Sequence, residues 1–294
     1  MRPPILDREE YIEQAYFFRV YRERLQDNIP SQEILQTIQE EILATTRLPM
    51  AIDFLRTEIL HSGRISDAMH RLPHYFAPFQ TFVVQRAEDD ESRFEQIIAL
   101  EILEREAAYR AKSPTPAGLF VFQFECITRN RLGYTEGLKA MAGDPLCSDD
   151  WTRWIIRLSS ELGGRELAEV VYLASQHFNN RRVSQRAPKP GETEPAAAVK
   201  IPLLFGDQEG RIAKANIGRD PLFFFAALQR QLDYPAVPRS QRVDDMQKLP
   251  VFLEARLNKI EQRLKIVEME TRGGIDLKQF YKNPDGEAPL TDFQ

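Results

Sequence analysis

Apolar residues recur three and four positions apart from residue 7 to residue 178, which is the spacing that places them on one face of a helix. In the first such segment, Tyr11, Ala15, Phe18 and Leu25 share a face. The segment 119–127 alternates aromatic residues as a strand does, but it lies between helix signals, and we predict a helix there. The pattern predicts helices over residues 7–25, 31–42, 49–62, 66–72, 73–87, 92–111 and 119–127, and two more between residues 148 and 178.

The pattern changes after Phe178. Residues 179–199 contain three prolines and predict a linker. Two short apolar runs then flank residues 206–210, a glycine-bounded stretch that predicts a small β-hairpin, and residues 222–232 predict a buried helix. The fold class expected is therefore mainly α, with a helical bundle followed by a small α+β C-terminal module.

A long amphipathic helix is expected near the end of that module. Its apolar positions alternate in steps of four and three, which is the a/d seam of a coiled coil. These positions are Leu253, Leu257, Ile260, Leu264 and Val267. Two interpretations stay open, because so short a seam in residues 249–270 is compatible with homo-oligomerisation and with docking on its own domain.

The sequence thus divides into five predicted regions. They are a helical bundle over residues 1–112, a second helical segment over 113–178, the linker 179–199, the module 200–270 and a tail over 271–294.

An internal repeat relates the first two regions. Residues 29–35 align with residues 132–138 at an offset of 103, and residues 65–76 align with residues 167–178 at an offset of 102. A duplication into two related halves, the second one truncated, would explain this register. Chance agreement between two sets of amphipathic helices would explain it too.

Several short motifs of the first region resemble those of a known family. They are Phe17-Phe18, the turn at Asn28-Ile29-Pro30, the element from Ser62 to Met69, the element Phe76-Ala77-Pro78 and Ala87-Glu88. In this order and spacing they resemble the cytoplasmic domain of the F-family platform protein of type II secretion and type IV pilus assembly. The resemblance covers residues 11–110, with a partial second copy over 119–178.

The resemblance implies an all-helical bundle that binds proteins and has no enzymatic activity. The partners it implies are a cytoplasmic secretion or pilus assembly ATPase and other platform components. The chain departs from the family in two ways. It has no apolar stretch long enough to be one of the family's membrane helices, and the glycines expected on either side of Glu88 are Ala87 and Glu91.

Composition and charge narrow the function classes. With 43% hydrophobic and 28% charged residues the chain is globular, and the net charge of -5 disfavours nucleic acid as a partner. The longest apolar run, residues 222–228, is far shorter than the roughly 20 residues of a membrane span. The N-terminus lacks the apolar core of a secretory signal, so a cytoplasmic location is expected.

Candidate chemistry is sparse, and the sequence assigns no catalytic residue, no cofactor and no metal. Glu58 and His61 have the spacing of a carboxylate-bridged metal site, so a helical metalloenzyme is one alternative function. Cys126 lies among aromatic residues and is expected to be a core thiol of raised pKa.

Basic and acidic clusters are the candidate interaction residues. Arg19, Arg22 and Arg24 alternate with aromatic residues. They border the core or, in a second alternative function that also uses the run Arg181 to Arg186, bind nucleic acid and stack on its bases. Three further interpretations of the run Arg181 to Arg186 stay open. It binds an acidic partner, it presents Ser184 to a kinase, or it only keeps the chain solvated. The acids Glu88, Asp89 and Asp90 are expected at the positive end of the helix from residue 92. The function we favour is a protein-interaction scaffold that uses these acids, Arg19, Arg22 and the a/d seam.

Overall fold

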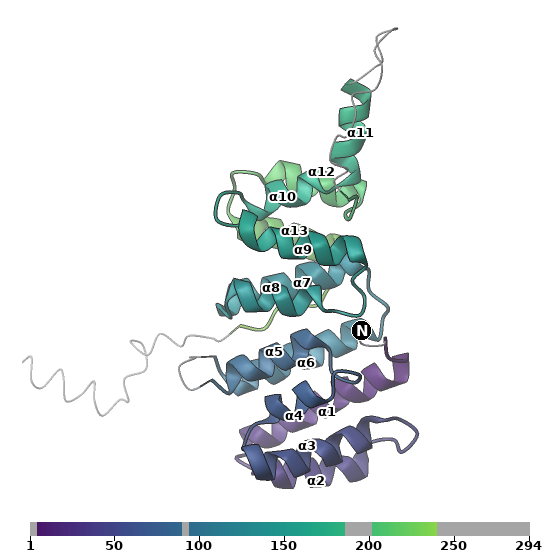
Figure 1. The fold of residues 1–294 in the computed structure, drawn as a ribbon, viewed down its shortest axis with the longest axis vertical. Coiled ribbons are helices and arrows are strands. Elements are labelled where there is room, and N and C mark those ends of the chain that lie inside the picture. The colour runs from purple at the N-terminus through teal and green to yellow at the C-terminus, as the bar shows by residue number, and fades with distance from the viewer. Residues whose placement is uncertain (1–4, 90–93, 186–201, 240–294) are drawn as a thin grey trace, which may run out of the picture. The chain divides into compact units, whose positions relative to one another are not determined.

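The computed structural model describes residues 5–89, 94–185 and 202–239, and the regular elements within these ranges are all helices (Figure 1). The mainly α fold is therefore confirmed. The helices are α1 (Arg8–Gln26), α2 (Ser31–Glu41), α3 (Leu48–Ser62), α4 (Ile65–Arg71), α5 (Pro78–Ala87), α6 (Gln96–Arg110), α7 (Pro116–Asn130), α8 (Tyr134–Ala142), α9 (Asp149–Glu161), α10 (Leu167–Leu173), α11 (Gln176–Gln185), α12 (Asp207–Asn216) and α13 (Pro221–Leu232).

Helix ends follow local chemistry. The side chain of Thr115 accepts a hydrogen bond from the Gly118 amide at 3.1 Å and so caps α7, which has Pro116 in its first turn. Asp220 caps α13 in the same way at 2.8 Å. Gly63 ends α3 with a φ of 72°, a left-handed conformation that glycine adopts without strain.

Helices α1 to α6 form a closed bundle. Each helix from α1 to α6 packs against the next one along the chain, and α6 returns to pack along α1. The face of α1 that is buried by this arrangement carries Phe17, Phe18 and Tyr21, each at most 3% exposed. This is the aromatic first helix of the predicted bundle, and Phe18 lies on the face that the apolar spacing indicated.

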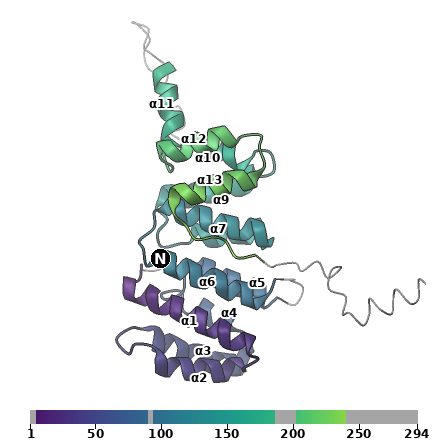
Figure 2. The same cartoon turned by 180° about the vertical axis from the view of Figure 1, so that it is seen from behind.

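A second bundle repeats most of this order of contacts, although α9 and α10 make little contact where α3 packs on α4. Helix α7 packs on α8, α8 on α9, α10 on α12 and α12 on α13, and α13 returns to α7 (Figures 1 and 2). Helix α11 interrupts the correspondence, because it follows α10 in the chain and packs beside α10 and α12. The helices that correspond to α1 to α6 are therefore α7, α8, α9, α10, α12 and α13.

Buried positions keep one register through the first half of both bundles. An offset of 103 residues relates the buried positions of α1 to those of α7, which pairs Phe17, Phe18 and Tyr21 with Phe120, Val121 and Phe124. The same offset relates α3 to α9, which pairs Leu48, Ala51, Ile52 and Leu55 with Trp151, Trp154, Ile155 and Leu158. The offset is 102 for α4 and α10. The register predicted beyond α10 is wrong: Phe76, which precedes α5, corresponds to Phe205 before α12 and not to Phe178.

The predicted α+β module is not supported, since residues 207–216 form α12 and not half of a hairpin. The glycine that suggested a turn serves close packing instead. A Cβ on Gly210 would lie 2.3 Å from the Ser175 hydroxyl oxygen, so only glycine lets α12 approach the chain at that point. Extended pairing in the described ranges is limited to one bridge, Ser175 with Phe205.

Two predicted boundaries also move. The linker expected from residue 179 begins later, because α11 continues to Gln185. Residues 202–239 do not form a separate region, since α12 and α13 complete the second bundle. The amphipathic helix with its a/d seam and the tail 271–294 lie outside the described residues.

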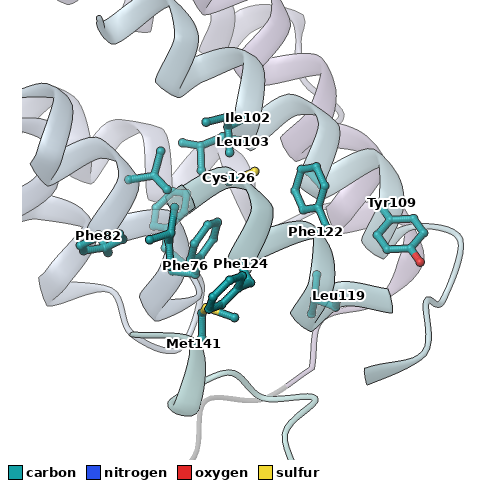
Figure 3. Close-up of a cluster of buried hydrophobic side chains, with 14 of the residues drawn as sticks. Phe76, Phe82, Ile102, Leu103, Tyr109, Leu119, Phe122, Phe124, Cys126 and Met141 are labelled. Atoms are coloured by element: carbon teal, nitrogen blue, oxygen red, sulfur yellow. The ribbon is translucent and has the colours of Figure 1, made fainter. Parts of the chain in front are cut away.

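The two bundles meet through α5 and α6 on one side and α7 and α8 on the other. Figure 3 shows the apolar part of this contact, where Ile102 and Leu103 of α6 lie close to Cys126 of α7. A Cβ on Gly137 of α8 would lie 2.5 Å from the Ile127 methyl carbon and 3.3 Å from the Phe82 ring. The missing side chain at Gly137 thus allows α8 to lie against both α7 and α5.

A buried ion cluster lies in the same contact. Arg110 at the end of α6 binds both Glu106, at 3.0 Å, and Asp144 in the loop between α8 and α9. Gln123 of α7 donates to Glu106 at 2.7 Å. The three charged side chains are at most 1% exposed, so their geometry and mutual hydrogen bonds must replace the water they have lost.

The two carboxylates of this cluster differ in their relation to Arg110. Asp144 is the main cause that raises the pKa of Arg110, whereas burial outweighs the effect of Arg110 on Glu106 and raises the pKa of Glu106. Arg110 is therefore charged and is paired first with Asp144. This pair joins the first bundle to the second, since its partners lie on either side of the contact.

The end of the second bundle crosses the same contact. The Tyr234 hydroxyl donates to Glu125 of α7 at 2.6 Å, and Tyr109 of α6 donates to the Leu232 carbonyl oxygen at 2.7 Å. Asn130 of α7 donates to the Pro238 carbonyl oxygen at 2.9 Å. Residues 232–238 therefore tie α6 and α7 together from the outside.

Replacement of Arg110 tests how much the ion cluster contributes to the free energy of unfolding. Arg110→Ala leaves two buried carboxylates without a countercharge, and we expect the free energy of unfolding to fall by about 3 to 5 kcal/mol. The matched control is Arg153→Ala, which removes an arginine that is 76% exposed and should cost less than about 1 kcal/mol. Urea denaturation followed by circular dichroism measures both, and equal losses would contradict the role given to Arg110.

Candidate functional site

Two of the predicted basic residues, Arg19 and Arg22, lie in different environments. Arg22 of α1 pairs with Glu104 of α6 at 3.1 Å and lies 3.8 Å from Glu101, so it joins two helices of the first bundle. Arg19 is exposed and its guanidinium lies 5.4 Å from the centre of the Tyr16 ring. The structure places Arg22 in helix packing and leaves Arg19 at the surface.

Glu88 does not act at the start of the long helix α6, where it was expected. Glu88 ends α5, and its carboxylate accepts from the backbone amides of Ile65 at 2.6 Å and Ser66 at 3.0 Å, at the start of α4. Asp89 pairs with Arg86 at 3.2 Å. The expectation that Glu88 serves the dipole of α6 is wrong, because the fold brings the positive end of α4 closer. Asp90, like Leu253, Leu257, Ile260, Leu264 and Val267, lies outside the described residues.

In the second bundle a carboxylate also joins the two corresponding helices, α10 and α12, but here the carboxylate precedes the fourth helix and the amide follows the fifth. The Glu166 carboxylate, just before α10, accepts from the amide of Gly218, just after α12, at 2.7 Å. The end of the fifth helix is thus fastened to the start of the fourth in each bundle. The acid at the first joint has a structural role.

The two candidate metal ligands, Glu58 and His61, do not come together in a site. Glu58 binds Arg71 at 2.7 Å, and His61 is exposed. Within the described ranges, no group of three or more histidine, cysteine, aspartate or glutamate side chains is placed to hold a metal ion. Cys126 is fully buried, and burial raises the pKa of its thiol, in agreement with its prediction as a core residue.

A groove on the second bundle has a volume of about 750 Å³. Its walls come from α9, from α10 and α11, and from the extended segment that precedes α12. It is lined by Asp150, Arg153, Trp154, Arg157, Leu173, Phe178, Asn179, Arg182, Pro202 and Leu203.

Three arginines dominate the polar surface of this groove. Arg153 pairs with Asp150 at 2.7 Å, and Arg157 pairs with Glu161 at 3.0 Å, along one side of α9. Arg182 of α11 has no carboxylate within ion-pair distance among the described residues. Among the described residues that line the groove, Asp150 is the one carboxylate against three arginines, so positive charge prevails in this part of it.

The walls are held by the core beneath them. Trp154 is 2% exposed and packs edge-on against Phe205, with ring centres 5.4 Å apart. His177 at the start of α11 lies 3.0 Å from the Asp207 carboxylate at the start of α12. The Ser175 to Phe205 bridge fixes the same segment. These contacts, one of them buried and one partly exposed, join the three walls.

Exposed apolar side chains occur in the groove and elsewhere on the helices that form it. Leu203 lines it and is 54% exposed. Ile156 precedes Arg157 on α9 and is 59% exposed, and Val183 follows Arg182 on α11 and is 62% exposed. Large apolar side chains in water beside a charged groove are typical of a surface that binds another protein.

Sequence analysis found only part of this groove. The run from Arg181 was recognised as a possible binding site for an acidic partner, and Arg182 does line the groove. The pair Arg153 and Arg157 has helical spacing, which is the signal that was missed. Pro202 and Leu203 are brought to the groove by the fold alone, because a predicted hairpin would have carried them elsewhere.

Comparison of the chain with protein-family models, curated proteins and solved structures gives no match. Of the helices described, none is both long and apolar enough to cross a bilayer.

The structural role of Glu88 can be tested by removal of its carboxylate. Glu88→Ala leaves two amides of α4 uncapped, and we expect a loss of about 1 to 2 kcal/mol in the free energy of unfolding. Asp89→Ala is the matched control and should cost less than about 1 kcal/mol, because its ion pair with Arg86 is partly exposed. Urea titration of both variants measures the difference, and a neutral Glu88→Ala would contradict the capping role.

Proposed function

We propose that the chain is a non-enzymatic scaffold that binds another protein. The observation that carries this proposal is the groove of the second bundle, whose arginines and exposed apolar side chains are held on a fixed frame. A frame of this kind lowers the entropy that binding costs, because its side chains need little reordering. Such a surface suits recognition of a polypeptide.

The predicted kinship with the F-family platform remains part of this proposal. Except for Phe17-Phe18 within α1, the motif elements behind the resemblance lie at the joints of the first bundle. Phe76 precedes α5 at its N-terminal cap, and Glu88 ties the end of α5 to α4. These positions support a shared bundle architecture, and the proposed partner is then an assembly ATPase or another platform component.

A second surface also favours protein contact. Leu222 and Phe223 at the start of α13 are 48% and 66% exposed, and Ile217 just before them is 41% exposed. This apolar corner lies at the turn between α12 and α13. The groove is the stronger candidate, because it adds charge and concavity to apolar exposure.

Site-specific crosslinking tests the scaffold proposal. A photoreactive amino acid at Leu203, introduced in cells that naturally contain the chain, is expected to form a discrete product with another protein. The matched control is the same amino acid at Thr57, an exposed position of α3 in the first bundle. Mass spectrometry identifies the product.

The identity of the product separates the parts of the proposal. An assembly ATPase or platform component would support the kinship, and another protein would support the scaffold alone. A product made of two copies of this chain would support the predicted homo-oligomer. Equal products from Leu203 and Thr57, or none from either, would contradict the proposed function.

A further inference from the structure

We infer that the groove of the second bundle binds an acidic, extended peptide segment of the partner. The carboxylates of this peptide would bind Arg153, Arg157 and Arg182, and an apolar side chain would lie against Leu173 and Leu203. This inference rests on the proposed function and names the chemistry of the partner.

The charge of the groove favours an anionic peptide. Three arginines line it against one aspartate. Two of the arginines already have ion pairs, but these pairs are exposed: Arg153 is 76% and Arg157 is 44% exposed. Exposed pairs contribute about 0 to 1 kcal/mol, so a peptide carboxylate can replace them at little cost.

Arg182 adds a third cation, which forms no ion pair with a carboxylate of the described residues. It lies on α11, a different wall from that of Arg153 and Arg157. A peptide that lies between the walls would be bound from both sides. Arginine suits this role, because its planar guanidinium binds a carboxylate through two parallel hydrogen bonds.

The spacing of the arginines on α9 suits an extended backbone. Residues four apart on a helix have Cβ atoms roughly 5 to 6 Å apart. In an extended strand, alternate residues are about 7 Å apart and point to the same side. Acidic residues at alternate positions would therefore lie opposite Arg153 and Arg157, while the intervening side chains point elsewhere.

The walls distinguish a peptide from nucleic acid. Trp154 is 2% exposed and offers no ring face on which a base could stack, which leaves Phe178 as the partly exposed ring among the described lining residues. Leu173, Pro202 and Leu203 form an apolar wall, whose side chains can pack against aliphatic side chains and offer no hydrogen-bond donor to a phosphate backbone. A peptide with both acidic and aliphatic side chains matches all of these features.

A synthetic peptide tests the inference directly. The probe is a short fluorescent peptide in which aspartate and glutamate alternate with leucine, and a peptide with lysine in place of the acids is the control ligand. Fluorescence anisotropy with the full chain measures Kd. We expect binding by the acidic peptide alone, with an affinity that weakens as salt is raised.

Matched variants locate the binding. Arg157→Glu/Arg182→Glu is expected to raise Kd at least about tenfold, which corresponds to about 1.4 kcal/mol. Arg165→Glu/Arg219→Glu makes the same charge change beside a smaller pocket of about 190 Å³ in the same bundle and should change Kd less than about twofold. Leu203→Ser should weaken binding and keep its salt dependence. Circular dichroism verifies that each variant is folded.

Several outcomes would overturn the inference. They are absence of binding by the unchanged chain, equal losses in the two charge-reversed variants, and displacement of the peptide by a single-stranded oligonucleotide of equal charge. The last result would identify a general polyanion surface.

The crosslinking experiment separates this inference from the proposed function. If the partner crosslinked at Leu203 is still captured by Arg157→Glu/Arg182→Glu, the scaffold stands and the acidic peptide is wrong. If peptide binding is lost as expected but no partner is ever crosslinked at Leu203, the groove chemistry stands and the scaffold is wrong.

Discussion

The arrangement of the two bundles depends on one buried contact between Arg110 and Asp144. A charge removed from water is tolerated only where another charge meets it, and these two charges come from opposite sides of the contact between the bundles. Apolar packing between α6 and α7 would permit small shifts, because dispersion forces have little directional preference. The paired arginine and its carboxylates define one position, and residues 232–238 fasten the same contact from the outside.

The candidate binding surface follows from this frame. Helices α7 and α9 carry the aromatic core on which the segment before α12 packs, with Phe120, Trp154 and Phe205 in mutual edge contact. That segment is the third wall of the groove. The insertion of α11 after α10 is the main difference between the two bundles, and it supplies Arg182. The second bundle thus gains its groove at the point where it departs from the first one.

Helical periodicity was sufficient to predict the class of the fold and the buried faces of most helices, since the same residues that recur every three or four positions are the buried ones. The offset of 103 residues predicted which positions correspond as far as α9. It could not predict the displacement of Phe205, because the insertion of α11 within the second bundle leaves no periodic signal. Gly210 was misread for a different reason: a glycine needed for close packing has the same local pattern as one needed for a turn. Asp144 and Glu88 act through partners distant in the chain, and no local pattern reveals such pairs.

Residue-resolved hydrogen exchange in increasing urea tests the central claim most directly, namely that the buried contact makes one cooperative unit of the two bundles. The account predicts that core amides of α3 in the first bundle and of α9 in the second exchange through a common opening with the same free energy and the same urea dependence. It further predicts that this agreement is lost in Arg110→Ala. Separate opening of α3 and α9 in the unchanged chain would contradict the claim.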